Sequence, residues 1–191
     1  MEEEERLIYG CIRGESWACE GIYKAYAPAM MSLCMRYVND RETARDLVQE
    51  GFIKVFGKIG AYSASGAFGG WVRRIFVTTS LEHLRRKDTW KYAGPVDECA
   101  GLMESVETDV MDRLSADDLL DCIAQLPAGY RTVFNMYAIE GYSHKEIAAS
   151  LGISEITSRT QFIRARNVLQ KCVQSLIENE NAGKERAKGI F

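Results

Sequence analysis

Proline is nearly absent from this chain, and no other feature limits its fold as strongly. The 191 residues contain only three prolines, Pro28, Pro95 and Pro127. Because proline removes a backbone donor and breaks helices, its scarcity permits long helices. Apolar residues recur at steps of three and four, and no segment alternates apolar and polar residues between hairpin turns. The sequence therefore predicts an all-α fold.

Apolar periodicity and capping residues place the expected helices. In the first half we expect helices at 4–12, 15–38, 42–59 and 68–87, and in the second half at 115–125, 128–140, 143–150 and 154–177. Pro28 could break or kink the second of them. Ser143 and Glu146 have the spacing of a capping box, and Ser154 can cap the last helix.

The charges divide the chain into zones. The net charge is −3, but residues 71–92 sum to +4, residues 93–128 to −8 and residues 141–191 to +3. Few apolar residues in the acidic zone follow a helical period before Leu114. We therefore expect two small helical domains, 1–92 and 114–178, joined by a flexible acidic linker at 93–113 and followed by a polar tail at 179–191.

Composition argues against several classes of protein. Apolar residues make up 47% of the chain, too many for a disordered one. The longest weakly polar stretch, 25–35, is too short to cross a bilayer, and the acidic start is unlike a secretory signal. We expect a cytoplasmic protein with no membrane contact. The six cysteines and two histidines are scattered. This spacing predicts no metal site, no cofactor, and reduced thiols rather than disulfides.

Residues 143–153 predict the first half of a helix-turn-helix, with Gly152 at the sharp turn. On the second helix, Phe162, Ala165 and Leu169 share the inner side. The outer side presents Arg159, Thr160 and Ile163, which suit the base edges of a major groove. Arg164 and Arg166 can neutralise phosphates. A plain helical hairpin with a polar outer face remains the alternative. We expect His144 to be an exposed helix residue.

The helix at 42–59 has two stripes. Its core stripe begins at Ala44 and Leu47 and ends at Ile59. Beside it, Asp46, Gln49, Glu50 and Ile53 recur at i, i+3, i+4 and i+7. Exposure of this second stripe to solvent would explain its three polar residues, but it would not explain Ile53. A helix that faces a protein partner presents such a mixture.

The segment 60–70 contains four glycines and joins that helix to a basic one. No GK[ST] follows it, so a phosphate-binding loop is disfavoured. It could accept an unstacked base, or it could be a plain connection. In the next helix Trp71 fits a core role by default. The helix dipole accounts for basic residues at its end but not for Arg73 and Arg74 at its start.

Taken in order, these motifs resemble the extracytoplasmic-function (ECF) sigma factors of bacterial RNA polymerase. The resemblance covers residues 7–92 and 115–170. It rests on the following residues and motifs: Gly14, Ala18, Tyr23, Tyr26 and Pro28; RDLVQEGFIKVFG at 45–57; FGGWVRRI at 68–75; Arg85 and Arg86; QLP at 125–127; Arg131; GYSHKEIA at 141–148; LGIS at 151–154; and RAR at 164–166. Thr78, Ile156 and Gln161 depart from residues that are usual in the family.

The resemblance implies an initiation factor without enzymatic activity, and it assigns roles to residues. Asp46, Gln49, Glu50 and Ile53 would dock on the clamp helices of the largest polymerase subunit. The −10 element would be read by Tyr62, Ser63, Trp71, Arg73, Arg74, Thr78, Arg85, Arg86 and Lys87. The −35 element would be read by Ser143, Lys145, Ser158, Arg159, Thr160, Gln161, Ile163, Arg164 and Arg166. Further partners would be the flap of the second-largest subunit and an anti-sigma factor.

Two other classes stay open at this point. A stand-alone helix-turn-helix regulator would use residues 115–177 and leave the mixed stripe at 42–59 without a role. An enzyme could use Asp46 and Glu50 as paired carboxylates, but no nucleophile or metal set in the sequence converges with them.

Overall fold

The computed structural model describes residues 2–63, 66–86 and 116–188, and every regular element within these ranges is a helix. The predicted linker at 93–113 lies outside the described residues. The chain divides into two compact units, Met1–Asp88 and Thr89–Phe191. The expected all-α class is therefore confirmed. No helix in the described ranges is both long and apolar enough to span a membrane.

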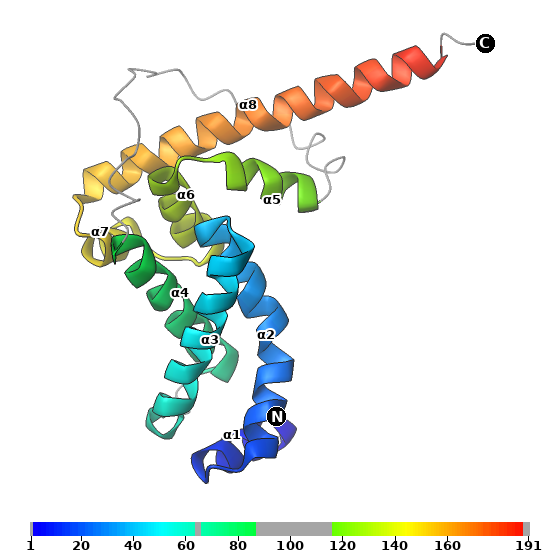
Figure 1. Cartoon of the computed structure of the whole chain (residues 1–191). Coiled ribbons are helices and arrows are strands. Elements are labelled where there is room, and N and C mark those ends of the chain that lie inside the picture. The colour runs from blue at the N-terminus through cyan, green and yellow to red at the C-terminus, as the bar shows by residue number, and fades with distance from the viewer. Residues whose placement is uncertain (1, 64–65, 87–115, 189–191) are drawn as a thin grey trace. The chain divides into compact units, whose positions relative to one another are not determined.

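Unit 1 contains α1 (Glu2–Ile12), α2 (Ser16–Val38), α3 (Arg41–Lys58), the 3-10 turn η1 (Ile59–Ala61) and α4 (Phe68–Arg86). Figure 1 shows these helices in blue to green, and α2 packs against each of the other three. Helix α2 continues through Pro28 without a break. It ends at Asn39, which adopts a left-handed conformation with a φ of 52°. Asp40 then starts α3 by accepting a hydrogen bond from the Thr43 amide.

The core of unit 1 follows the predicted stripe. Ala44, Leu47, Val48, Phe52, Val55 and Ile59 are buried, and Phe56 is half-buried. From α4, Val72 and Phe76 are fully buried, whereas Trp71 and Ile75 are only half-buried. The rings of Phe52 and Phe76 meet edge to face at 5.2 Å. This contact fixes the crossing of α3 and α4, the two helices that carry the predicted interfaces.

Two glycines of α3 test this packing. A Cβ on Gly51 would lie 2.5 Å from the buried Phe76 ring, whereas a Cβ on Gly57 would meet nothing within 4 Å. Gly51→Ala should therefore destabilise the protein by about 1–3 kcal/mol through overpacking. Gly57→Ala should stabilise it by up to about 1 kcal/mol, because alanine favours helix. Urea unfolding followed by tryptophan fluorescence measures both, and equal shifts would refute the close crossing.

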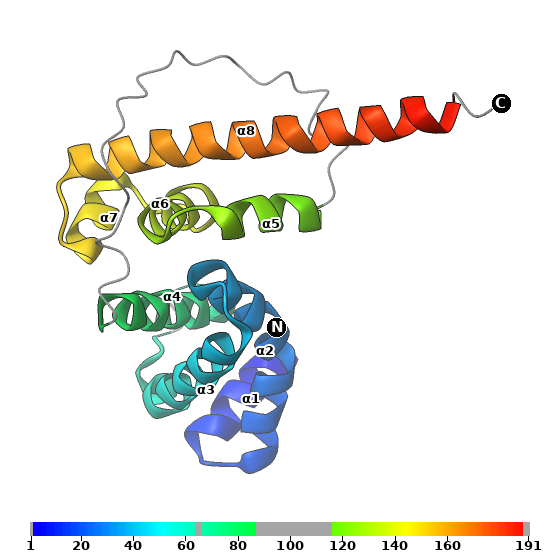
Figure 2. The same ribbon diagram turned by 45° about the horizontal axis from the view of Figure 1, so that its top comes forward.

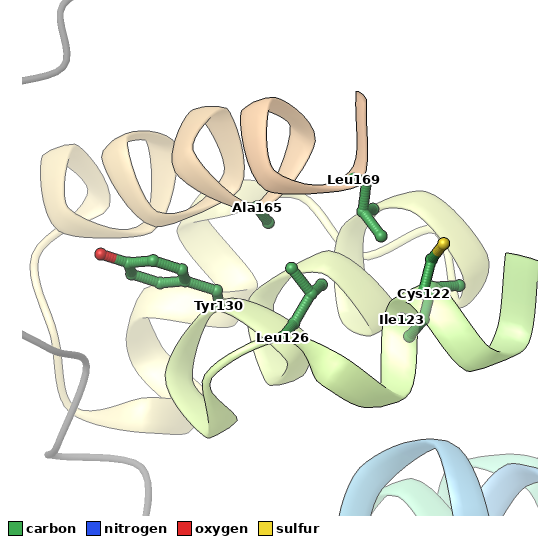
Figure 3. Packing of buried hydrophobic residues seen from close by; sticks show 6 residues of the cluster. All are labelled: Cys122, Ile123, Leu126, Tyr130, Ala165 and Leu169. Atoms are coloured by element: carbon green, nitrogen blue, oxygen red, sulfur yellow. The ribbon is translucent and has the colours of Figure 1, made fainter. Parts of the chain in front are cut away.

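Unit 2 contains α5 (Ala116–Gln125), α6 (Ala128–Phe134), the π-helical turn η3 (Asn135–Ile139), α7 (His144–Leu151) and α8 (Glu155–Lys188). Figure 2 shows α5 and α7 alongside α8. The core in Figure 3 consists of Cys122, Ile123, Leu126, Tyr130, Ala165 and Leu169. The predicted inner side of the last helix is confirmed. The helix is longer than expected, since residues 179–188 of the expected tail are helical.

The expectation of reduced thiols is wrong for one pair. Cys122 of α5 and Cys172 of α8 form a disulfide, with Cα atoms 6.0 Å apart, an ordinary separation for such a bond. The prediction depends on the expected cytoplasmic location and on the scattered positions of the cysteines. Neither indicates which faces of two helices pack together. The two residues are 50 positions apart, and only the packing of α5 on α8 brings them together.

Candidate functional site

The predicted partner face of α3 lies on the surface of unit 1. Asp46 and Gln49 are exposed, and Glu50 is half-buried. Ile53 is 73% exposed, the largest value among the exposed large apolar side chains of this unit. Ile53 therefore contributes little to the core and lies on the surface between polar neighbours.

Glu50 also belongs to an ion-pair cluster between α3 and α4. Lys54 Nζ lies 2.8 Å from Glu50 Oε1 and 2.8 Å from Glu82 Oε2, and Arg86 Nη2 lies 3.3 Å from Glu50 Oε1. The hydrogen bond from Lys54 lowers the pKa of the Glu50 carboxyl. Sequence reasoning missed Lys54 and Glu82. The i,i+4 spacing of Glu50 and Lys54 could have indicated the first, but Glu82 is reached only through folding.

The loop before α4 is organised by aromatic rings. Phe68 is fully buried, and its ring contacts Tyr62 at 5.1 Å and Trp71 at 5.6 Å. The Tyr62 hydroxyl donates a hydrogen bond to the Gly66 carbonyl. Tyr62 and Trp71 are both half-buried, and Ser63 is exposed. This aromatic loop therefore presents two partly open rings, those of Tyr62 and Trp71, which pack against the buried Phe68 ring.

The basic residues of α4 reach solvent along the helix. Arg74, Arg85 and Arg86 are exposed, and Arg73 is half-buried. Thr78 is exposed, and its hydroxyl donates to the Arg74 carbonyl at 2.9 Å. Lys87 lies outside the described residues. The described basic residues and Thr78 therefore share one helix, α4, which begins at the aromatic loop.

In unit 2 the predicted caps of the helix-turn-helix are confirmed. Ser143 and Glu146 form a complete capping box at the start of α7. Gly152 ends that helix with a φ of 67°, a conformation that favours glycine. The Thr157 amide then donates to Ser154 Oγ at 2.9 Å, which caps α8. These contacts fix the angle at which α8 follows α7.

The outer face of α8 carries most of the predicted DNA-binding residues. Arg159, Thr160, Ile163 and Arg166 are exposed, as are Ser143 and Lys145 before and within α7. Gln161 and Arg164 are half-buried. Arg159 forms an exposed ion pair of 2.6 Å with Glu155, one turn earlier on the helix. Ile163 is 54% exposed, so an apolar group is available next to the polar ones.

Two expectations in this region are wrong. Ser158, a predicted DNA contact, is fully buried, and so is most of His144, which was expected to be exposed. The His144 Nδ1 atom and the Ser158 hydroxyl share a hydrogen bond of 2.9 Å, and the Tyr137 ring stacks on the imidazole at 4.2 Å. The pair joins α7 to α8 from the inside. A buried polar pair leaves no periodic signal in a sequence, because polar residues are read as outward-facing.

The His144 environment gives unit 2 a pH dependence. Burial, aided by the nearby Arg159 charge, lowers the pKa of His144 below the ordinary histidine value of 6.5, although Glu155 opposes the effect. As the pH falls through the unfolded-state pKa, the unfolded chain binds the proton first, so unit 2 should lose stability. An NMR titration of the imidazole measures the folded pKa directly. A value at or above 6.5 would contradict the buried geometry.

Comparison with known proteins agrees with this arrangement. The family model "Sigma-70 region 2" matches residues 22–89, and "Sigma-70, region 4" matches residues 116–169. The RNA polymerase sigma-H factor of Pseudomonas aeruginosa is 27% identical over 187 residues, covering 93% of this chain and 97% of that protein. The ECF RNA polymerase sigma-E factor of Escherichia coli is 27% identical over 184 residues, covering 91% of this chain and 96% of that protein.

A solved structure shows the same fold. The sigma factor RpoE of Bartonella quintana, in complex with the anti-sigma factor NepR, aligns with a TM-score of 0.50 and 20% identity. The alignment covers 81% of this chain and 96% of that one. The protein is a promoter-directing transcription initiation factor. It belongs to the extracytoplasmic-function sigma factors of the sigma-70 family.

Proposed function

We propose that unit 1 docks on core RNA polymerase through the α3 face. Its occupant would be the clamp helices of the largest subunit, as the family resemblance implies. The observation that carries the proposal is Ile53, which is 73% exposed among Asp46, Gln49 and Glu50. Interfaces with a central apolar side chain and a polar rim match this composition. The Lys54 ion pairs hold Glu50 in a defined position for the contact.

The −10 element would be read at the aromatic loop and α4. Tyr62 and Trp71 are half-open rings on a fixed support, which suits an extruded base, and Ser63 lies beside them. Arg73, Arg74, Arg85, Arg86 and Lys87 would follow the phosphates of the melted strand. Thr78, exposed on the same helix, would lie near that strand.

The −35 element would be read as duplex by α8 in the major groove. Arg159, Thr160, Gln161 and Ile163 offer base-edge contacts, and Ser143, Lys145, Arg164 and Arg166 would contact phosphates. Ser158 is removed from this set by its burial. Unit 2 would also meet the flap of the second-largest subunit. An anti-sigma factor would cover these surfaces, as NepR binds the Bartonella quintana relative.

Promoter recognition needs no catalytic centre, so the protein would be a non-enzymatic factor. It would act in the cytoplasm, where RNA polymerase and promoter DNA are found. A stand-alone regulator would not need the exposed Ile53 face. The two functions differ in a gel shift with and without core polymerase. We expect the free chain to bind promoter DNA weakly, and we expect the affinity of the holoenzyme to be at least about 100-fold higher. Docking on polymerase holds the two weak DNA-binding units together, which gives each a high effective concentration at its element. Equal and selective binding without polymerase would refute the proposal.

A further inference from the structure

Two thiols meet where α1 turns back into α2. The sulfur atoms of Cys11 and Cys19 lie 2.9 Å apart. A disulfide bond measures about 2.05 Å, so the sulfurs need to approach by only about 0.9 Å. Cys11 is 7% exposed, and Cys19 is half-buried. The pair is separate from the α3 face and from the aromatic loop.

The two helices hold this pair in a tight framework. A Cβ on Gly10 would lie 2.6 Å from the Ala18 Cβ, so the helices cross closely one residue before each cysteine. Gly14 makes the connecting turn with a φ of +77°. An ion pair of 2.7 Å between Arg13 and Glu15 spans the same turn. The fold therefore holds the two sulfurs in contact, and only the short approach between them remains for a bond to form.

The two thiols differ in how readily they react. Burial, together with the contact to Cys19, raises the pKa of the Cys11 thiol to about 12, so Cys11 keeps its proton. Cys19, which is partly exposed, is the sulfur that a small oxidant reaches first. Cys34 on the same helix is fully buried, and burial raises the pKa of its thiol to about 11. Cys34 is thus an internal control for reaction with solvent.

We infer that Cys11 and Cys19 form a dithiol oxidation site for hydroperoxides, which converts the pair to a disulfide. The Cys19 thiolate attacks a peroxide oxygen, the O–O bond breaks, and hydroxide leaves as water after taking a proton. Cys19 is then a sulfenic acid. The Cys11 sulfur attacks the Cys19 sulfur, the S–O bond breaks, and hydroxide leaves as a second water with the Cys11 proton. In total, two thiols and one hydrogen peroxide give one disulfide and two waters.

The disulfide would fasten α1 to α2. Helix α1 is the first helix of unit 1 along the chain, and it contacts η1 as well as α2. Closing the short loop between Cys11 and Cys19 removes freedom from the unfolded chain. The melting temperature of unit 1 should therefore rise by about 5 °C or more on oxidation. Dithiothreitol should reverse the shift.

Peptide mapping of the full chain tests the site. Trypsin cuts after Arg6, Arg13, Lys24 and Arg36, which places Cys11, Cys19 and Cys34 in three different peptides. After treatment with equimolar hydrogen peroxide and alkylation of the remaining thiols, we expect peptides 7–13 and 14–24 to appear linked. Peptide 25–36 should stay free and alkylated once the protein is unfolded. Linkage of Cys34, or Cys19 oxidised to sulfinic acid with Cys11 still a thiol, would overturn the proposal.

The Cys11→Ser variant is the matched control. It leaves Cys19 as the exposed thiol but removes its partner, so the variant should show no linked peptides and no shift in melting temperature after peroxide. The chain's third tryptophan, Trp90, belongs to the range of unit 2, so the melting is measured in a Trp90→Phe background. There the fluorescence of Trp17 and Trp71 reports unit 1 separately from unit 2 and its Cys122–Cys172 disulfide. An equal shift in the variant would show that the pair is not the oxidation site.

Discussion

Asp46→Ala combined with Glu50→Ala is expected to lower the affinity for core RNA polymerase by at least about 100-fold. Each carboxylate lies on the exposed face of α3 beside Ile53. Removing a carboxylate whose charge pair becomes buried when the complex forms costs about 2 kcal/mol or more, and two such losses act together. Co-purification with core enzyme, or the loss of labelled DNA from the holoenzyme band, measures the effect.

The fold should survive this double substitution. Asp46 is exposed, and after Glu50 is truncated Lys54 still has its ion pair of 2.8 Å with Glu82. Glu20→Ala on α2 is the matched control, because it removes an exposed carboxylate that forms a surface ion pair with Lys24, and such pairs contribute little. The control should bind polymerase normally. Undiminished binding by the double variant, with an unchanged circular dichroism spectrum, would remove α3 from the interface.

Much of the fold follows from the sequence because helical burial is periodic. The core stripe of α3 and the inner side of α8 are set by apolar residues at steps of three and four, and these steps survive folding unchanged. Caps are equally local, since Ser143, Glu146 and Ser154 act within one turn of the helix they start. The surfaces that carry Ile53 and Arg159 could be predicted for the same reason.

Features that join distant residues could not be predicted in this way. Cys122 meets Cys172, and Glu82 meets Lys54, only because two helices pack with a particular register. For His144 the sequence predicts an exposed position because polar side chains usually face water, and for Ser158 the family resemblance implies a DNA contact. Each instead satisfies the other's hydrogen bond in the interior, which removes most of the cost of burial.

That buried pair has a consequence for DNA recognition. It ties the start of α7 to the first turn of α8 from the inside, while the Ser154 cap fixes the start of α8. The proposed recognition residues that follow on α8 are therefore carried by a rigid corner. Rigid placement matters because bidentate contacts to a base edge tolerate little error in position.

The second large effect is expected from Arg159→Ala, which should change promoter preference and not only promoter affinity. Arg159 is exposed on the outer face of α8, and its ion pair with Glu155 is a surface pair that a guanine edge can replace at small cost. Losing a bidentate base contact costs about 1–3 kcal/mol, or about 5- to 150-fold, and only at promoters that carry the matching base.

Run-off transcription on templates that differ only in the −35 element measures this selectivity. Lys145→Ala is the matched control, since an exposed lysine that contacts phosphate should weaken all templates equally and reduce the salt dependence of binding. If Arg159→Ala also weakens every template by the same factor, Arg159 contacts phosphate, and base recognition must come from Thr160, Gln161 or Ile163. Unequal losses would place Arg159 at a base edge and fix the orientation of α8 in the groove.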